Sequence, residues 1–462
     1  MNVHGNPKAT GTPAPYVVTD PERIPSRRYY DAAFFELERE RLWPHVWQMA
    51  CRLEEIAEVG DYVEYRLLDK SVIVVRTKSG VKAFHNACRH RGVQLVTGTG
   101  NCRTKGFICP FHGWRWNMEG ENTFVFGKQI FSPEALDKAE INLVPCRLET
   151  WGGCAFINFD WEAPGLAESM GPVLDRLALR NPEHLKMEWW YATELPTNWK
   201  LAMEAFMEGY HLMRTHPQLH VLQLTRPFGE DLVSSPAPAR NFTGPQAVDQ
   251  FIRGLEVLRE GMAGQVSARE IDILRDLRDT MDLPEDMGEA IAMVLPKLLK
   301  EITARGRAAG LAVPDLLKIA ETRDRGVEFM FPHFFMLPVF SAMASYRIRP
   351  LTPETCLFEI WGIDHFREGE RETPRQPTFL PHDSPEFPEV PRQDYHNLPL
   401  QQLGLHAMGF ESMRLSHRFE GLISNYQRLI DGYLAGLDPE LLAAASRTVN
   451  DGYDAPIADI GF

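Results

Sequence analysis

Two short segments of the sequence combine cysteine and histidine at close spacing. Cys88 and His90 form the first pair, and Cys109 and His112 form the second. Thiolates and imidazoles are ligands of iron–sulfur clusters and of zinc. A zinc finger usually pairs cysteine with cysteine and histidine with histidine, whereas two thiolates suit one iron of a two-iron cluster and two imidazoles suit the other. We therefore expect a [2Fe–2S] cluster here; a zinc site or unrelated core residues are the alternatives.

The residues around the two pairs favour the cluster. The sequence "HRG" begins at His90, and "PFHGW" surrounds His112. Glycine and threonine between the pairs let backbone N–H groups approach the sulfides, and hydrogen bonds to sulfur raise the potential of a cluster. Cys102 and His85 lie nearby but outside the pairing, and we expect both to be structural. Two thiolates with two imidazoles are the ligand set of a Rieske centre.

A second group of candidate metal ligands lies in "NWKLAMEAFMEGYHLMRTH", which ends at His216. On a helix, Glu204, Glu208 and His211 share one face. His216 follows His211 by five positions, so the helix must loosen or break between them if both imidazoles bind one metal. Two histidines and one carboxylate form the facial triad of mononuclear Fe(II) oxygenases, which leaves coordination positions open for O₂.

The carboxylate of such a triad must come from a distant part of the chain. The segment "QDYHNLPLQQLGL" offers Asp394, followed by Asn397. Asp364 in "WGIDHF" is the alternative ligand. For any single aspartate, a role as a loop cap is the simpler interpretation.

Different patterns surround the two groups of ligands. Residues 62–86 alternate as strands do, with a hairpin turn at "KSG", and more short strands follow near "GFICPF" and "CAFINF". Residues 31–50 have helical spacing up to Pro44. The first ligand group therefore lies in a small all-β domain that follows an N-terminal helix.

Past residue 185 the pattern becomes mixed. Residues 246–322 are almost all helical, with a capping box from Ser267 to Glu270. Long strands are expected in "VEFMFPHFFMLPVFSAMASYRIRPL" and "TCLFEIWGIDHF". Residues 374–391 contain six prolines and predict an extended loop, and the chain is expected to be helical again from about Leu398 to Leu437.

The two ligand groups together resemble the large (α) subunit of the non-haem iron ring-hydroxylating oxygenases, over nearly the whole chain. The resemblance implies an α+β fold: an arm and helix (1–44), a Rieske [2Fe–2S] domain (45–165), and a helix-grip catalytic domain (166–462) with an antiparallel sheet and a helical insertion at about 246–322. It also implies that Cys88, His90, Cys109 and His112 hold the cluster, and that His211, His216 and Asp394 bind mononuclear Fe(II).

Two positions depart from the family pattern. Glu208 stands where the family usually carries aspartate, which bridges toward the Rieske centre of a neighbouring subunit, and we expect a catalytic role for it. This change resembles the branch that acts on quaternary amines, such as carnitine and glycine betaine monooxygenases. Ala205 stands where the family commonly has asparagine.

The implied activity is that of a terminal oxygenase using O₂. Electrons come from NAD(P)H through a separate reductase, with or without a ferredoxin, because the sequence has neither a G-x-G-x-x-G motif nor a second cluster motif. We expect mono- or dioxygenation of a hydrophobic aromatic or polycyclic substrate. The alternative is a monooxygenase or demethylase of a quaternary amine or a methoxy or N-methyl compound. A Rieske electron carrier without catalysis is an alternative of another class, against which the His211/His216 pair argues. The implied assembly is a trimer, alone or with β subunits.

Composition restricts the remaining function classes. The chain has 462 residues and a net charge of −14, so we expect no nucleic-acid partner. No stretch approaches about 18 consecutive apolar residues, so no membrane span is expected. The beginning of the sequence lacks the pattern of a signal peptide. The seven cysteines are an odd and sparse number, which does not suggest a disulfide framework. These features predict a cytoplasmic protein.

Overall fold

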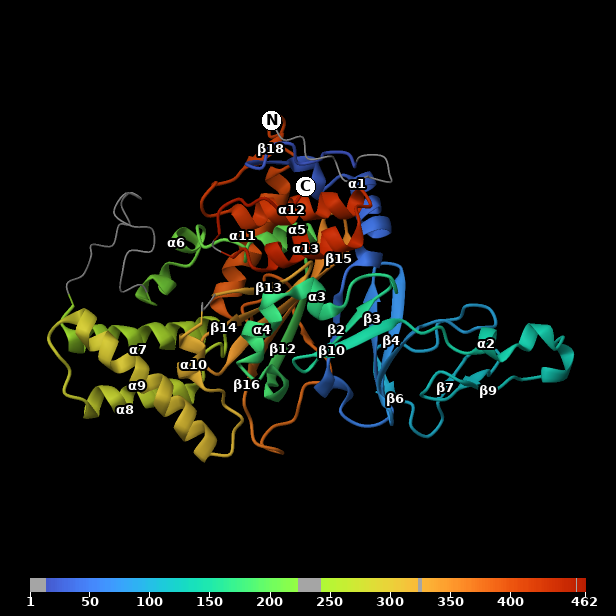
Figure 1. The fold of residues 1–462 in the computed structure, drawn as a ribbon, viewed down its shortest axis with the longest axis horizontal. Coiled ribbons are helices and arrows are strands. Elements are labelled where there is room, and N and C mark those ends of the chain that lie inside the picture. The colour runs from blue at the N-terminus through green and yellow to red at the C-terminus, as the bar shows by residue number, and fades with distance from the viewer. Residues whose placement is uncertain (1–13, 223–241, 323–325, 454) are drawn as a thin grey trace.

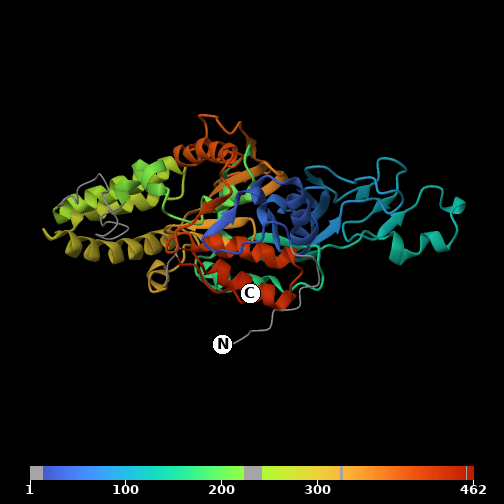
Figure 2. The same ribbon diagram turned by 90° about the horizontal axis from the view of Figure 1, so that it is seen from above.

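The computed structural model describes residues 14–222, 242–322, 326–453 and 455–462. Strands at one end of an elongated molecule and a helical layer at the other flank a central sheet with helices on it (Figures 1 and 2). The predicted α+β class is confirmed. Within the described residues, no helix combines the length and apolarity that crossing a membrane would require.

The N-terminal segment packs against the C-terminal helices. Asp31 caps the first helix, since its side chain accepts a hydrogen bond from the backbone N–H of Phe34. This helix continues through a π-helical turn and ends near Pro44, as its sequence predicts. The elements are β1 (Arg23–Pro25), η1 (Ser26–Tyr29), α1 (Ala32–Leu37), η2 (Glu38–Leu42) and η3 (Trp43–His45).

Three small sheets follow, and the alternating segments become strands as expected. At the predicted turn, Gly80 pairs with Thr77 and has a φ of 128°, which glycine adopts without strain. The sheets have the orders β10-β11-β2, β5-β4-β3-β6 and β7-β8-β9. Their strands are β2 (Gln48–Arg52), β3 (Asp61–Leu67), β4 (Lys70–Thr77), β5 (Gly80–His85), β6 (Thr99–Asn101), β7 (Phe107–Ile108), β8 (Arg115–Trp116), β9 (Asn122–Phe124), β10 (Arg147–Trp151) and β11 (Cys154–Asn158). The short helical pieces of this part are η4 (Leu53–Ile56), η5 (Lys128–Ile130), η6 (Glu134–Leu136) and α2 (Lys138–Ile141).

The central sheet has six strands in the order β13-β14-β15-β16-β12-β17. Its pairings are antiparallel except at the edge, where β17 runs parallel to β12. The helix α5 (Trp199–Glu204) lies against β15 and β16. The strands are β12 (Lys186–Leu195), β13 (Glu328–Met330), β14 (Phe334–Pro338), β15 (Met343–Thr352), β16 (Thr355–Asp364) and β17 (Thr378–Phe379).

The expected helical insertion forms a layer with its own apolar core at one end of the molecule (yellow in Figure 1). The capping box is present, because the backbone N–H of Ser267 donates to Glu270 Oε2 at 2.9 Å. The helices are α7 (Gly244–Gly261), α8 (Ala268–Thr280), α9 (Met287–Ala308) and α10 (Leu316–Ala320).

Two helical expectations differ from the structure. The loop expected over 374–391 already ends at Glu389, where α11 begins; Pro391 fits there because the first turn of a helix leaves N–H groups unbonded anyway. The helix expected from Leu398 to Leu437 is two helices separated by β18 (Ser412–Arg414), which pairs with β1. The remaining elements are α3 (Leu166–Met170), α4 (Pro172–Ala178), η7 (Pro182–His184), α6 (Leu212–Thr215), η8 (Pro217–Leu222), α11 (Glu389–Gly404), α12 (Gly421–Leu434) and α13 (Pro439–Asn450).

Candidate metal centres

Two turns of similar geometry carry the Cys/His pairs. The backbone N–H of Cys88 bonds to Val93 O, and that of Cys109 bonds to Trp114 O, both at 2.8 Å. In each turn a glycine four residues after the cysteine donates back to the cysteine carbonyl. Both glycines have positive φ values, 75° and 70°, so the "HRG" and "PFHGW" sequences supply the residue that each turn requires.

The turns bring the four candidate ligands together. The rings of His90 and His112 have their Nδ1 atoms 3.1 Å apart. Both cysteines are buried, their thiols interact with each other, and burial raises the pKa of Cys88. Two thiols therefore lie together, as do two Nδ1 atoms. This arrangement suits one iron held by sulfur and one held by nitrogen.

The second group converges on one point as well. One possible ligand atom from each of His211, His216 and Asp394 lies within 4.8 Å of the other two. Asp394 Oδ1 is 3.1 Å from His216 Nε2 and 3.9 Å from His211 Nε2. The alternative ligand Asp364 lies elsewhere, where its carboxylate pairs with Arg269 at 3.0 Å. Two imidazole nitrogens and one carboxylate oxygen are a donor set that fits Fe(II).

The chain between α5 and His216 departs from one expectation. The helical interruption lies before His211 rather than between the two histidines, since α5 ends at Glu204. His211 and His216 occupy the N-cap and C-cap of the short helix α6. A single helical turn thus separates the two rings, and their centroids are 5.3 Å apart.

Each candidate imidazole ligand is oriented by a side chain that accepts from its Nδ1–H. Glu208 Oε1 lies 2.7 Å from Nδ1 of His211, and its other oxygen accepts from the His211 backbone N–H at 2.9 Å. Gln393 Oε1 lies 2.6 Å from Nδ1 of His216 and also accepts from Gln218 Nε2 at 2.8 Å. Because these oxygens can only accept, both histidines carry the proton on Nδ1 and present Nε2 to a metal.

The electrostatics of His211 reflect this contact. Burial by itself lowers the pKa of His211, but the hydrogen bond and the charge of Glu208 outweigh burial, and the pKa is raised. Glu204, which shares a predicted helical face with Glu208, instead points into the protein core and accepts from Tyr29 and Gln427. Of these two glutamates, Glu208 is the one that contacts a candidate metal ligand.

Aromatic side chains pack beside Asp394. The rings of Phe335 and Tyr346 stack with centroids 4.7 Å apart, and Phe206 packs against both, with centroids 4.6 and 4.9 Å away. The buried hydroxyls of Tyr346 and Tyr395 have no hydrogen-bond partner within the described structure. Burial chiefly raises the pKa of both tyrosines, and the nearby Asp394 charge raises it further. The region next to the triad is thus apolar, with two available hydroxyl groups.

Sequence reasoning did not identify Gln393 or Gln218. Gln393 directly precedes Asp394, but a neutral amide belongs to no ligand motif, and its contact with His216 spans 177 positions. Cys102 is buried and His85 lies against Phe159, which agrees with the structural roles expected for them. Asn397 is exposed on α11.

Comparisons with known proteins agree with both centres. A family model for the Rieske [2Fe–2S] domain matches residues 46–125, and one for the ring hydroxylating alpha subunit (catalytic domain) matches residues 182–436. A naphthalene 1,2-dioxygenase structure with indole in its active site superposes with a TM-score of 0.60 and 19% identity, covering 93% of this chain and 96% of that chain. The apo quaternary ammonium Rieske monooxygenase gives a TM-score of 0.58 and 18% identity, with coverages of 90% and 97%. These likenesses support the fold.

Curated relatives include several oxygenase subunits. The carnitine monooxygenase oxygenase subunit of Acinetobacter baumannii is 30% identical over 42% of this chain and 52% of its own length. The 2-aminobenzenesulfonate 2,3-dioxygenase subunit alpha of Alcaligenes sp is 33% identical over 43% and 50%. The biphenyl dioxygenase subunit alpha of Metapseudomonas furukawaii is 28% identical over 73% and 69%. The chain thus spans about half the length of the first two. Since the catalytic-domain match covers more than half of it and follows a Rieske domain, the chain belongs to the ring-hydroxylating alpha-subunit family.

Proposed function

We propose that this chain is the terminal oxygenase of a multicomponent system and inserts oxygen from O₂ into a small organic substrate. The observation that carries the proposal is the convergence of two imidazole nitrogens and one carboxylate oxygen within 4.8 Å. When bound, Fe(II) supplies O₂ activation and the Rieske cluster supplies electrons. The proposed iron ligands are His211, His216 and Asp394, and the proposed cluster ligands are Cys88, His90, Cys109 and His112.

The protein's own groups prepare this chemistry. Glu208 and Gln393 hold the protons on Nδ1, so both Nε2 atoms face the metal position. Asp394 contributes the one anionic ligand and is almost fully buried. Tyr346, next to Asp394, packs on Phe206, so the site has an apolar neighbour on this side, and such surroundings limit the access of water and side reactions. Electrons come from a separate NAD(P)H-dependent reductase, with or without a ferredoxin.

Two substrate classes have support. The aromatic side chains beside Asp394, and the similarity to a biphenyl dioxygenase alpha subunit, favour a hydrophobic aromatic or polycyclic substrate. Glu208 in place of aspartate, and the similarity to a carnitine monooxygenase subunit, favour oxygenation or demethylation of a quaternary amine. Aromatic faces can also bind such a cation.

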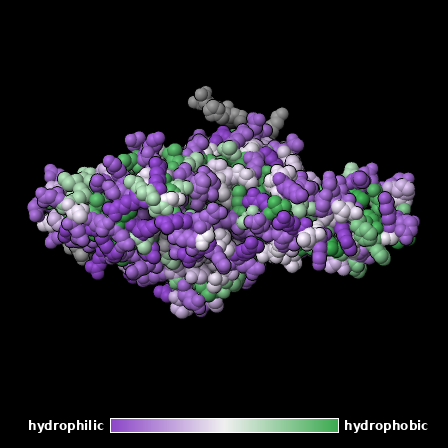
Figure 3. Space-filling view, turned by 90° about the horizontal axis from the view of Figure 1, so that it is seen from below, coloured by the Kyte–Doolittle hydropathy of each residue, from purple (hydrophilic) through white to green (hydrophobic). Residues whose placement is uncertain are grey.

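We further propose that electrons pass between chains of a head-to-tail trimer, alone or with β subunits. In Figure 1 the cluster-binding end near β7 and the helix α6 lie on opposite sides of the molecule. Hydrophobic side chains gather at the cluster-binding end (Figure 3), and Phe111, Phe126 and Ile130 there are 58%, 67% and 78% exposed. In this arrangement Glu208 bridges His211 of one chain and His112 of the next. A head-to-tail contact of this kind forms a ring when the rotation that relates neighbouring chains returns to the first chain.

Metal analysis with one variant tests the proposal. The anaerobically purified oxygenase should contain about three irons per chain, whereas an electron carrier would contain about two. His211→Ala should lose one iron, keep the Rieske spectrum and lose oxygenation of a substrate panel supplied with a surrogate reductase. A protein that carries only zinc, or a His211→Ala variant with unchanged iron content, would overturn it.

A further inference from the structure

A pocket of about 710 Å³ lies against the outer side of the mononuclear site. Thr215 and Gln393 line it, and these residues directly precede His216 and Asp394 in the chain. Gln393 also holds the ring of His216, so a single side chain separates the pocket from an iron ligand. The size is within the range of small-molecule sites, about 300–1,000 Å³.

The charge of the pocket wall is opposite to that of the whole chain. Arg214 and Arg392 both line it, although the net charge of the protein is −14. Neither arginine pairs with a carboxylate in the part of the chain that the structure describes; Arg392 donates only to Pro385 O, at 3.3 Å. Among the described lining residues Asp383 is the one carboxylate, so two arginines against one aspartate leave this part of the wall with a net positive charge.

The position of the two arginines links them to the chemistry. Arg214 lies on α6 between the two histidine ligands, and Arg392 lies on α11 two positions before Asp394. Pro399 lines the same pocket, and the largely buried Tyr395 borders it, so part of its wall is apolar. A ligand with an anionic group and an apolar body matches these walls, because a planar guanidinium binds carboxylate or sulfonate oxygens in pairs.

We propose that this pocket binds the carboxylate or sulfonate group of an anionic substrate beside the iron site. The inference deepens the proposed function and rests on it for the identity of the ligand as a substrate. Binding of an anion to the pocket itself does not depend on turnover. The two ideas can therefore fail separately.

Equilibrium binding to the iron-loaded full chain, without reductase, tests the proposal. The probes are 2-naphthoate and naphthalene-2-sulfonate, with 2-naphthamide as their neutral counterpart, and binding is followed by fluorescence anisotropy. The anions should bind at least roughly ten-fold more tightly than the amide, because charge-assisted hydrogen bonds exceed neutral ones. The difference should shrink as salt concentration rises.

Variants place the binding in this pocket. Arg392→Gln should weaken anion binding roughly ten-fold or more and leave iron content and the Rieske spectrum unchanged, and Arg392→Lys should restore part of the affinity. Arg103→Gln, an exposed arginine in the Rieske domain, is the matched control and should have no effect. Equal affinity for anions and amide, or unchanged anion binding in Arg392→Gln, overturns the pocket. Binding of an acidic ferredoxin that depends on Arg392, without anion binding, also overturns it. Tight anion binding to a protein that oxygenates nothing would contradict the proposed function and leave the anion site standing.

Discussion

The two imidazoles of the mononuclear site are held by acceptors of different charge. His211 donates to the carboxylate of Glu208, whereas His216 donates to the neutral amide of Gln393. A carboxylate acceptor fixes the tautomer of the imidazole and also makes the imidazole more basic. An amide acceptor fixes the tautomer without adding a second negative charge to the site. The amide is itself oriented by Gln218, so its oxygen points to His216.

Replacing Gln393 by methionine should weaken iron binding. Methionine has a similar size but cannot accept the Nδ1 proton of His216, so the ring loses its orientation. We expect the affinity for Fe(II) to fall roughly 10- to 100-fold, as for other outer partners of histidine ligands. Titration of the metal-free protein, with Co(II) absorption as a second readout, measures this change.

The matched control is Gln401→Met, an exposed position on the same helix. It should bind metal as the wild type does, and both variants should retain the Rieske spectrum. Unchanged Fe(II) and Co(II) affinity in Gln393→Met would show that Gln393 has no part in orienting the ligand.

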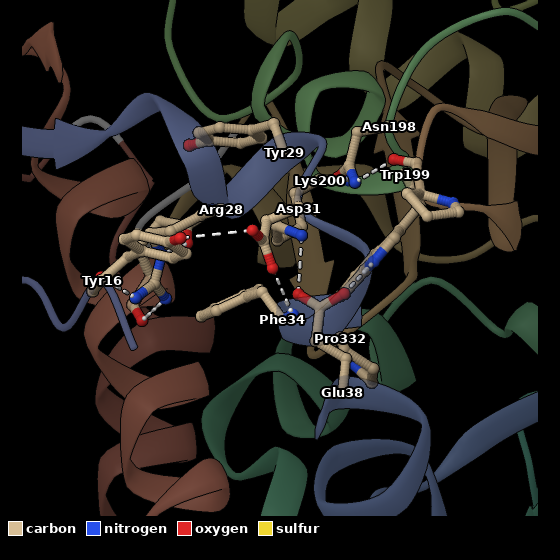
Figure 4. Close-up of polar contacts among 12 residues, drawn as sticks. Tyr16, Arg28, Tyr29, Asp31, Phe34, Glu38, Asn198, Trp199, Lys200 and Pro332 are labelled. Carbon is tan, nitrogen blue, oxygen red and sulfur yellow. Dashed lines mark hydrogen bonds and ion pairs between the residues drawn. The ribbon is translucent and has the colours of Figure 1, made fainter. Parts of the chain in front are cut away.

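At the scale of the elements, a buried ion pair joins α5 to the N-terminal segment. Lys200 on α5 and Glu38 on η2 are fully buried, and their charged atoms lie 2.6 Å apart (Figure 4). Trp199 Nε1 also donates to Glu38, at 3.1 Å. Since α5 lies against the sheet near the metal site, this contact fixes the position of the N-terminal segment against the catalytic domain.

Lys200→Met should destabilise the protein strongly, because it leaves the Glu38 carboxylate buried without a cation. The expected loss in free energy of unfolding is about 3–5 kcal/mol. Adding Glu38→Leu to Lys200→Met should recover much of that loss, since both charges are then removed from the core. Denaturant unfolding of the two variants measures this difference, and a double variant less stable than Lys200→Met would contradict the account.

Another buried acid, Glu204 on α5, predicts how the stability of the protein depends on pH. Burial raises the pKa of Glu204 to about 7 from 4.5, although Gln427, Tyr29, Lys200 and Arg28 act in the opposite direction. The folded state therefore binds this proton more tightly than the unfolded chain does. The resulting stabilisation is complete below pH 4.5 and is lost as the pH rises toward 7.

Glu204→Gln should remove this dependence, because its amide cannot ionise. Between pH 4.5 and 7 the free energy of unfolding of the wild type should fall relative to that of the variant by about 3 kcal/mol. Unfolding curves at several pH values test this prediction. Parallel pH profiles for the two proteins would refute it.

The sequence predicted those elements whose formation depends on neighbouring residues. The hairpin at Gly80 and the capping box at Ser267 follow from local geometry, and both are present. The sequence predicted a break in the helix between His211 and His216, and this position was wrong. The break lies earlier, between the end of α5 at Glu204 and the single turn α6, which His211 and His216 cap. The pairing of Lys200 with Glu38 spans 162 positions, and no local pattern reports such a contact.

At the scale of the whole molecule, the separation of the two centres restricts how electrons can travel. The cluster-binding end near β7 and the helix α6 lie on opposite sides of the molecule (Figure 1). A head-to-tail ring would bring the cluster of one chain next to the iron of its neighbour. The motifs predicted both centres because the candidate ligands of each centre come from short sequence segments. No sequence motif reports how far apart the two centres lie in the folded protein.

Two inactive variants combined in one oligomer distinguish transfer between chains from transfer within a chain. Cys88→Ser removes the cluster and spares the mononuclear iron, whereas His211→Ala does the reverse, so each alone should be inactive in multiple turnover. In trimers assembled at random from equal amounts, an intact iron has an intact neighbouring cluster at about a quarter of the sites. Co-expressed variants should therefore recover about a quarter of wild-type turnover if the cluster of one chain delivers electrons to the mononuclear iron of the next chain. Adding Glu208→Gln to the Cys88→Ser chain should abolish most of this recovery, because the proposed bridge between the two centres then loses its charged carboxylate. The iron content should stay normal. No recovery in oligomers shown to contain both variants, or full activity of a wild-type monomer, would contradict transfer between chains.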